Sequence, residues 1–344
     1  DVMEANIRAV AETCRRHGVS WRPHAKGHKT PAIAQAQIAA GAIGVTCAKL
    51  AEAEAMAAGG VRDMLVANLI VGRHKVARLV ELRRAADPVI CLDHIEQALP
   101  ISRAMAAAGL RQRAIIEVDI GLRRVGVPPG EATLKFARQL GELPGIELAG
   151  IMGYEGHLLA VEDADQKAAA IRAALTTLVD TRDLLEAAGI ACPIVSCAGT
   201  GSYLYAARQA GITELQAGGA IFMDAYYRHK CQVPDLDFAL TVCATVVSRP
   251  AAERAIIDAG RKTMHGDFQA PFVVGRDDIR VGRLSAEHGE LQLSPAAEGL
   301  RIGDRVTLVP GYADLTTVLH NQYYCFRGGR LVAIWPITAR GCLT

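Results

Sequence analysis

Two histidines and two lysines lie close together in the segment RPHAKGHKT, at residues 22–30. A partly buried lysine has a lowered pKa, and its free amine can attack an aldehyde to form a Schiff base. Lys26 is the candidate for such a nucleophile, and the alternative is that Lys26 and Lys29 are solvated charges at the start of a helix, which is the more common role of an isolated lysine. His24 and His28 are four residues apart, as in some metal sites, but their position around Lys26 favours contacts with a cofactor or substrate. The choice between these roles depends on the elements that position the segment.

The first two thirds of the chain alternate between apolar runs with β-branched residues and stretches with helical periodicity. Eight strands are predicted, and a stretch that can hold a helix follows each of the first seven. Such repeated βα units predict an α/β fold, a TIM (β/α)8 barrel, over residues 1–234. A doubly wound open sheet is the alternative, but no GxGxxG phosphate turn follows the first strand. The predicted strands span residues 19–26, 43–48, 63–68, 88–92, 114–119, 146–153, 193–197 and 213–217.

The sequence changes character after Pro234, where short strands separated by turns replace the helical stretches. This change predicts a smaller all-β domain at residues 235–344, within the usual size range of a domain. An RIGD turn at residues 301–304 precedes one of its strands. The strands predicted in this domain span residues 238–248, 255–258, 305–309 and 331–335.

Three glycine-rich turns and one lysine follow the predicted barrel strands. A barrel places its catalytic groups at the C-terminal ends of its strands, and Lys26 lies at the end of the first. EVDIGLRRVGV (117–127) ends the fifth strand, and CAGTGSY (197–203) and ELQAGGAIFMDAYY (214–227) follow the seventh and eighth. Glycine turns after the last two strands are where barrels hold phosphate. Together with a Schiff-base lysine, these turns predict a pyridoxal phosphate site.

The chain resembles the D-threonine aldolase and D-serine dehydratase-like family, which has the alanine racemase type of pyridoxal phosphate fold. The resemblance covers nearly the whole chain, in PHAKGHK, GVTCAKLAEAEAM, DIGLRRVGV, GYEGH, GTGSY, ELQAGGAIFMDAYY, VPGY and WPITARG. It implies that Lys26 bears the cofactor, that Arg124 contacts the phenolic oxygen of the cofactor, and that His24 and Tyr154 lie beside it. The phosphate cradle that the resemblance implies consists of Thr200, Gly201, Ser202, Gly218 and Gly219.

The chain departs from this family at one position of the second domain. Family members of known activity carry a metal-binding histidine followed two positions later by aspartate or cysteine, in a VPGHxD or VPGHxC context. Here the stretch reads VPGYAD, so Tyr312 replaces the histidine and Asp314 keeps the carboxylate. Three interpretations stay open: Asp314 holds Mg²⁺ or Mn²⁺ weakly through oxygen ligands, the Tyr312 phenol acts as an acid or base, or Tyr312 only packs. The first is preferred, and Zn²⁺ is disfavoured because it would lack a nitrogen or sulfur ligand.

Two further histidines lie near the predicted site. His157 follows the sixth strand, a position equally compatible with a substrate contact and a structural hydrogen bond. His320 lies in VLHNQYY on a predicted strand, and a structural role is its preferred interpretation.

The activity implied by the resemblance is that of a pyridoxal phosphate-dependent lyase. Asp314 matches the aldolase variant of the family motif, which favours cleavage of a D-β-hydroxy-α-amino acid, such as D-threonine or a 3-hydroxyaspartate, to glycine and an aldehyde. Dehydration of a D-serine-like or 3-hydroxyaspartate-like substrate is the second alternative, and racemisation by Lys26 and Tyr312 is the third. A non-catalytic cofactor carrier is least favoured, because such carriers consist of the barrel alone. The resemblance also implies a head-to-tail homodimer, with Tyr312 and Asp314 placed over the cofactor of the other subunit.

Composition favours a small-molecule partner. The 344 residues are 51% hydrophobic, and 38 lysines and arginines nearly balance 36 acidic residues without a basic run, so we expect no nucleic-acid partner. No apolar run has transmembrane length, and no signal peptide is present, so we expect no membrane partner. The nine cysteines lack CxxC spacing and indicate reduced packing residues of a cytoplasmic protein. The chain begins inside a predicted helix without an initiator methionine, so we expect a leading segment before it.

Overall fold

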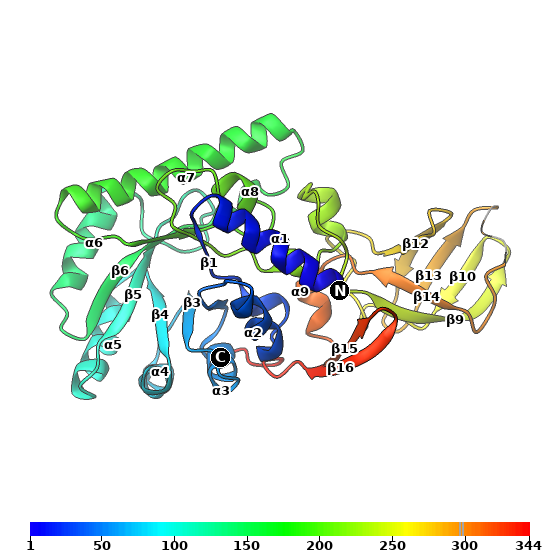
Figure 1. Ribbon diagram of the computed structural model, residues 1–344, viewed down its shortest axis with the longest axis horizontal. Helices are drawn as coiled ribbons and strands as arrows, with labels where there is room; N and C mark the ends of the chain where they lie inside the picture. Colours follow the sequence, from blue (N-terminus) through cyan, green and yellow to red (C-terminus); the bar gives the residue numbers. More distant parts are fainter. Residues whose placement is uncertain (296, 298) are drawn as a thin grey trace. The chain divides into compact units, whose positions relative to one another are not determined.

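A computed structural model of the chain describes residues 1–295, 297 and 299–344. The chain divides into two units (Figure 1). The barrel unit comprises Ile7–Gly218 and Thr338–Thr344, and the β unit comprises Asp1–Asn6 and Gly219–Ile337. The domain boundary that the sequence suggested, between residues 234 and 235, stays a prediction.

Eight parallel strands form one sheet in the barrel unit, in the order β1-β8-β7-β6-β5-β4-β3-β2. The predicted TIM-type barrel is therefore confirmed, and every predicted strand of this part overlaps an observed one, although β1 and β8 have only 2 residues each. The strands are β1 (Ser20–Trp21), β2 (Val45–Cys47), β3 (Asp63–Leu69), β4 (Asp87–Leu92), β5 (Gln112–Glu117), β6 (Ile146–Met152), β7 (Ile194–Cys197) and β8 (Glu214–Leu215).

The first and second strands meet beside the loop that contains the candidate lysine. His24 and Thr46 form a parallel bridge, and the Thr46 N–H donates to the Pro23 carbonyl at 2.8 Å. The Thr46 hydroxyl donates to the Arg22 carbonyl at 3.0 Å. The segment around Lys26 therefore begins where β1 and β2 are joined, so its backbone is anchored at its start.

Helices follow the strands and cover the outside of the sheet (Figure 1). Helix α2 begins with Thr30 as its N-cap and Pro31 in its first turn, where the missing N–H of proline costs no helical hydrogen bond. No helix in the described part of the chain has the length and apolar character needed to cross a membrane. The helical elements are α1 (Val2–Arg16), η1 (Ala25–Gly27), α2 (Pro31–Ala39), α3 (Leu50–Ala58), α4 (Arg73–Ala85), α5 (Ile95–Ala107), α6 (Glu131–Gly141), η2 (Gly156–Leu158), α7 (Ala164–Ala187) and α8 (Tyr203–Ala206).

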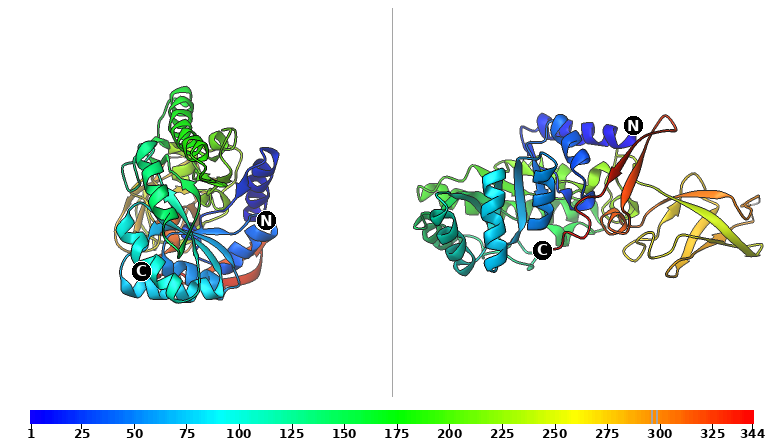
Figure 2. Two further views of the ribbon diagram at one scale, coloured as in Figure 1. Left: turned by 90° about the vertical axis from the view of Figure 1, so that its left-hand side faces the viewer. Right: turned by 90° about the horizontal axis from the view of Figure 1, so that it is seen from below.

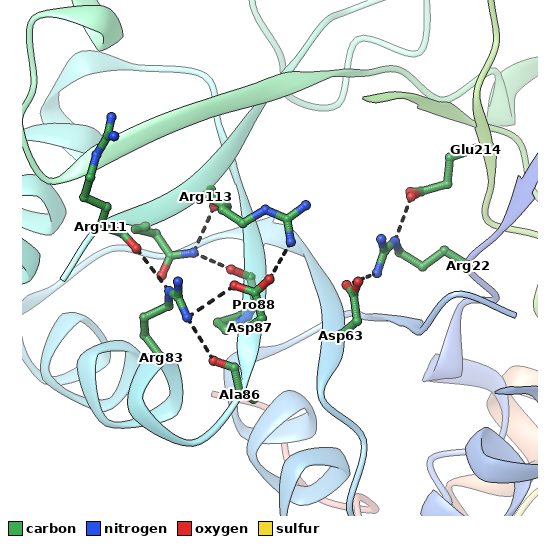
Figure 3. Close-up of polar contacts among 10 residues, drawn as sticks. Arg22, Asp63, Arg83, Ala86, Asp87, Pro88, Arg111, Arg113 and Glu214 are labelled. Carbon is green, nitrogen blue, oxygen red and sulfur yellow. Dashed lines mark hydrogen bonds and ion pairs between the residues drawn. The ribbon is translucent and has the colours of Figure 1, made fainter. Parts of the chain in front are cut away.

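Arg22 forms ion pairs with carboxylates of two barrel strands (Figure 3). Arg22 Nε donates to Glu214 Oε2 at 2.8 Å, and a second guanidinium nitrogen of Arg22 bonds to Asp63. Ser196 donates to the other Glu214 oxygen at 2.8 Å. The side chains of Arg22 and Glu214 are each 3% exposed, and buried charges of this kind require such pairing. Asp63 and Glu214 are the first residues of β3 and β8, and Arg22 directly follows β1, so these ion pairs link three strands of the barrel.

The β unit contains a closed antiparallel barrel with the strand order β10-β13-β12-β11-β14-β9. Its core includes Val246, Ile257, Leu291 and Leu308, which are fully buried. A separate hairpin, β15–β16, stands apart from that barrel (Figure 2). The elements are η3 (Gly219–Ile221), η4 (Tyr226–Lys230), β9 (Val242–Ala251), β10 (Arg254–Ile257), β11 (Phe272–Val273), β12 (Ile279–Leu284), β13 (Gly289–Leu293), β14 (Arg305–Val309), α9 (Ala313–Thr317), β15 (Gln322–Arg327) and β16 (Arg330–Pro336).

Candidate active site

The segment that follows β1 gives its charged residues distinct tasks. His24 is the N-cap of η1, and its Nδ1 accepts the Lys26 backbone N–H at 3.3 Å. His28 Nδ1 accepts the N–H of Thr30 at 3.1 Å, next to the start of α2. Lys29 Nζ lies 3.4 Å from Glu52 Oε1 in an ion pair whose two side chains are at most 8% exposed. Lys29 therefore has a structural role, which makes Lys26 the stronger candidate for the cofactor-bearing lysine.

The electrostatic surroundings keep His24 neutral. Burial lowers the pKa of His24 well below its ordinary value, and the positive charges of Lys26, Lys29 and Arg124 lower it further. A neutral imidazole has one acceptor nitrogen, and the hydrogen bond from the Lys26 N–H assigns that function to Nδ1. His24 can therefore offer an Nε2–H donor to a bound group.

Arg124 follows β5 and lies beside two other candidate residues. Its Nη2 donates to Glu117 Oε1 at 3.2 Å, and its guanidinium carbon lies 5.7 Å from the centre of the Tyr154 ring. Burial raises the pKa of Glu117, while the charge of Arg124 and its hydrogen bond act in the opposite direction. The buried carboxylate thus orients the arginine, whose side chain is still 51% exposed and can reach a ligand.

The glycine turns after β7 and β8 have the features of an anion cradle. A Cβ added to Gly218 would lie 2.1 Å from the His24 carbonyl oxygen, and one added to Gly199 would lie 2.9 Å from Tyr154 Oη. Only glycine permits these close approaches. Thr200 Oγ1 is buried, and no described residue hydrogen-bonds to it. Ser202 Oγ accepts the Gly199 N–H at 3.1 Å. An orphaned buried hydroxyl beside close-packed glycines fits the phosphate of pyridoxal phosphate.

The predicted cofactor residues divide between the two units. Those of the barrel unit all follow the C-terminal ends of strands. His24 contacts Lys26 and lies against Gly218, and Arg124 contacts Tyr154. Gly219 belongs to the β unit, as do Tyr312 and Asp314. The barrel-unit set comprises His24, Lys26, Arg124, Tyr154, Thr200, Gly201, Ser202 and Gly218.

Tyr312 and Asp314 are hydrogen-bonded to each other in the β unit. The Tyr312 hydroxyl donates to Asp314 Oδ2 at 3.1 Å, and Tyr312 is the N-cap residue of α9. The Tyr312 ring centre lies 5.5 Å from the ring centres of both Tyr226 and Phe268. No group of three or more histidine, cysteine, aspartate or glutamate side chains in the described residues could hold a metal ion. The arrangement thus offers one carboxylate and one phenol.

Sequence reasoning missed Asp224, which is completely buried in the β unit. Its Oδ1 accepts the Tyr227 N–H at 2.8 Å, and its Oδ2 accepts the Ala313 N–H at 2.8 Å. Burial, with a smaller contribution from the charge of Asp314, raises the pKa of Asp224 to about 7. The available signal was an acidic residue inside the apolar run AIFMDAYY.

Glu155 is a second acidic residue that sequence reasoning missed. It is completely buried after β6, and burial raises its pKa against the opposing effects of the Ser202 hydroxyl and nearby backbone N–H groups. Within the described residues, neither carboxylate oxygen has a hydrogen bond of normal geometry. An acidic residue in the short motif GYEGH, between a strand and a glycine, was the signal.

The two remaining histidines differ in their surroundings. His157 is exposed, and its Nε2 lies 2.9 Å from the place of a Cβ on Gly121, at the glycine turn after β5. His320 Nε2 lies 2.7 Å from the Thr263 carbonyl oxygen. The prediction that His320 lies on a strand is wrong, because α9 ends at Thr317 and β15 begins only at Gln322.

Comparison with known protein families gives two matches. The family model described as alanine racemase, N-terminal domain, matches residues 1–226. The model described as putative serine dehydratase domain matches residues 239–326. The two matches together cover most of the chain.

Curated relatives match along nearly their whole length. D-threonine aldolase of Arthrobacter sp is 37% identical over 340 residues, which cover 98% of this chain and 90% of the relative. 3-hydroxy-D-aspartate aldolase of Paracoccus denitrificans (strain Pd 1222) is 34% identical over 350 residues, with 99% and 90% covered.

Solved structures show the same similarity in three dimensions. The crystal structure of D-threonine aldolase from Filomicrobium marinum matches with a TM-score of 0.96 and 36% identity, covering 100% of this chain and 94% of that one. D-threo-3-hydroxyaspartate dehydratase from Delftia sp. HT23 matches with a TM-score of 0.89 and 28% identity, covering 98% and 94%.

Proposed function

Because this chain belongs to the alanine racemase N-terminal domain family, we propose that it is a pyridoxal phosphate-dependent lyase that cleaves a D-β-hydroxy-α-amino acid to glycine and an aldehyde. The observation that carries the proposal is the cradle of Gly199, Thr200 and Gly218 beside the Lys26 segment, in a chain similar to two D-specific aldolases. D-threonine and 3-hydroxy-D-aspartate are the substrate types that the names of these relatives indicate.

Apart from Gly219, the residues that hold the cofactor belong to the barrel unit. Lys26 is the attachment point, and Arg124 contacts the phenolic oxygen. The phosphate is held by Thr200, Gly201, Ser202, Gly218 and Gly219. Pyridoxal phosphate supplies an electron sink for the charge left on Cα when the Cα–Cβ bond breaks.

Two polar residues orient the bound cofactor. The neutral His24 donates from Nε2, since its Nδ1 is engaged by the Lys26 amide. Tyr154 lies against Gly199 and beneath Arg124, so it holds the arginine at the edge of the cradle. Both residues act by fixing geometry in a site with little freedom to rearrange.

Aldol cleavage requires an acceptor for the proton of the β-hydroxyl group. The hydrogen-bonded pair of Tyr312 and Asp314 is the proposed acceptor. Asp314 is also the proposed ligand for Mg²⁺ or Mn²⁺, which accept carboxylate oxygen and water as ligands. One carboxylate and one phenol form a sparse ligand set for such an ion.

Dehydration is the second candidate activity. D-threo-3-hydroxyaspartate dehydratase of Delftia sp. (strain HT23) is 30% identical over 359 residues, which cover 97% of this chain. Dehydration needs a base at Cα and an acid at the leaving hydroxyl, whereas aldol cleavage needs a base at the hydroxyl and then a proton donor at Cα to form glycine. Racemisation by Lys26 and Tyr312 is the third candidate. The presence of the β unit argues against a non-catalytic carrier.

A homodimer in the cytoplasm is part of the proposal. In the β15–β16 hairpin, Tyr324 and Phe326 are each 60% exposed, and Leu331 and Val332 are 50% and 54% exposed. A two-stranded hairpin is only marginally stable in water, and an exposed apolar surface of this kind supports contact with another subunit. In such a dimer Tyr312 and Asp314 serve the cofactor of the other subunit. All nine cysteines are free, which supports a reducing compartment.

One incubation experiment tests the activity. Purified protein is given pyridoxal phosphate and D-threonine, D-serine or D-3-hydroxyaspartate, with and without EDTA. We expect glycine and an aldehyde from D-threonine or D-3-hydroxyaspartate, and no product from L-threonine, which is the stereochemical control. Keto acid and ammonia as the main products would show dehydration instead, and no turnover of any substrate would contradict both activities.

A further inference from the structure

Segment 224–227 contacts the loop that carries Tyr312 through a series of backbone hydrogen bonds within the β unit. The Ala225 N–H donates to the Pro310 carbonyl at 3.2 Å, and the Tyr226 N–H donates to the Gly311 carbonyl at 3.0 Å. These two bonds fix the part of the loop that precedes Tyr312. They do not fix the peptide that follows Tyr312, which is held by a further contact.

That contact is made by the Asp224 side chain. Its Oδ2 accepts the N–H of Ala313, the residue between Tyr312 and Asp314, at 2.8 Å. Its Oδ1 accepts the Tyr227 N–H at 2.8 Å, so the two oxygens join two separate segments. Asp224 is completely buried, so water cannot replace either bond.

The far side of the loop is closed by close packing. The Gly311 N–H donates to the His265 carbonyl at 2.9 Å. A Cβ added to Gly311 would lie 1.9 Å from the Gln269 carbonyl oxygen. The loop therefore cannot shift toward residues 265–269 without a clash. The Tyr312–Ala313 peptide is held at both of its polar groups, because the Thr316 hydroxyl donates to the Tyr312 carbonyl at 2.8 Å and the Ala313 N–H donates to Asp224.

We propose that Asp224 is a positioning residue that fixes Tyr312 and Asp314 through the Ala313 amide. The proposal rests on the proposed function, because it assigns Tyr312 and Asp314 to the reaction. The role proposed for Asp224 involves no contact with the substrate. It holds the peptide between the two reacting side chains, so the phenol and the carboxylate keep the geometry of their 3.1 Å hydrogen bond.

The test variant is Asp224→Asn, which keeps the size of the side chain and replaces one acceptor oxygen by an amino group. The matched control is Asp258→Asn, because Asp258 also accepts a backbone N–H, that of Thr245 at 2.7 Å, in the same unit. Hydrogen exchange is measured by mass spectrometry on the peptide of residues 309–317. We expect faster exchange at the Ala313 amide in the Asp224 variant and none of that change in the control. This measurement does not depend on activity, so it separates failure of the positioning role from failure of the proposed aldolase function.

A double-mutant cycle on kcat tests the functional part. We expect Asp224→Asn to lower kcat about 10- to 100-fold, the usual cost of misplacing reacting groups by about 1 Å, with a smaller effect on KM. In a Tyr312→Phe/Asp314→Asn background the same substitution is expected to cause no further loss. Equal losses in both backgrounds, or unchanged exchange at Ala313 together with unchanged kcat, would overturn the proposal.

A second pair of variants covers the case in which the asparagine variant does not fold. Asp224→Ala leaves the buried Ala313 N–H without an acceptor, and adding Ala313→Pro removes that N–H. Proline is tolerated there because Ala313 is the first residue of α9 and Tyr312 before it is extended, with φ −148° and ψ 120°. We expect the proline to restore thermal stability and slow exchange in peptide 309–317 relative to Asp224→Ala. No restoration by the proline would also count against the Ala313 amide as the point of action.

Discussion

Replacing Tyr312 by phenylalanine separates the role of its hydroxyl from that of its ring. The hydroxyl donates to Asp314 Oδ2 at 3.1 Å, while the ring centre lies 5.5 Å from those of Tyr226 and Phe268. Phenylalanine keeps the ring contacts and removes only the donor. A hydrogen bond to a charged group contributes about 1.5–3 kcal/mol, which limits the effect on Asp314 to roughly 10- to 100-fold.

The size of the loss distinguishes two roles for Tyr312. If Asp314 holds a divalent ion, EDTA removes activity, Mg²⁺ or Mn²⁺ restores it, and Tyr312→Phe costs no more than the roughly 10- to 100-fold of the lost hydrogen bond. If the phenol is the acid or base, EDTA has no effect and Tyr312→Phe costs about 10²- to 10⁴-fold. We expect the first outcome, because Asp314 is only 8% exposed and a cation stabilises a carboxylate at such a position. Tyr312→His is then expected to tighten Mn²⁺ binding by adding an imidazole ligand.

The assay measures kcat and KM for D-threonine cleavage with and without EDTA, and Mn²⁺ binding by calorimetry. Tyr205→Phe is the matched control, because Tyr205 belongs neither to the predicted cofactor residues nor to the hairpin, and phenylalanine keeps its ring beside Lys167 Nζ, 5.9 Å away. Full activity of the wild type in EDTA, together with an inactive Tyr312→Phe variant, would refute the metal interpretation.

Three other predictions follow from the barrel unit and the hairpin. Lys26→Ala is expected to abolish the visible absorbance of bound cofactor. Lys29→Ala breaks the ion pair with Glu52 and should mainly lower thermal stability. A borohydride-reducible cofactor bond in Lys26→Ala would contradict the assignment of Lys26. Burial raises the pKa of Glu155, so folding favours its protonated form and stability falls as pH rises above the ordinary glutamate pKa. In cofactor-free protein, Glu155→Gln should therefore flatten the decrease of melting temperature with pH. An unchanged decrease in that variant would disprove the prediction. Sedimentation is expected to show a homodimer, and a fully active monomer would exclude the shared site.

The barrel could be predicted from the sequence because its signals are local. Buried parallel strands such as β4 and β5 are continuous apolar runs, and each is followed by a helix with its own periodicity. The strands β11, β12 and β13 escaped prediction, and the strand predicted at VLHNQYY begins only at Gln322, as β15. In β13 only alternate residues are buried, and β11 has 2 residues that are held by pairing with β12 and β14. Their existence depends on partners, which a single segment does not specify.

Some residues of the predicted site could be located from local sequence, and others depend on tertiary partners. The glycine turns could be located because glycine is the residue that close backbone approach requires, as at Gly218 against His24. The roles of Lys26, Arg124 and the phosphate-binding residues stay predictions until a bound cofactor is observed. Glu155 and Asp224 could not be selected from sequence, because an acidic residue within an apolar run has no defined partner until the chain is folded.

The sequence by itself determined the order of the barrel elements and the place of Lys26 in the segment after the first strand. These are properties of single segments, and periodicity and residue type are sufficient to specify them. Only the tertiary structure decided that Lys29 pairs with Glu52, 23 residues away, and that Asp224 holds the amide of Ala313, 89 residues away. Such bonds require two segments to approach within about 3 Å in one orientation, and that approach is set by the packing of the whole unit.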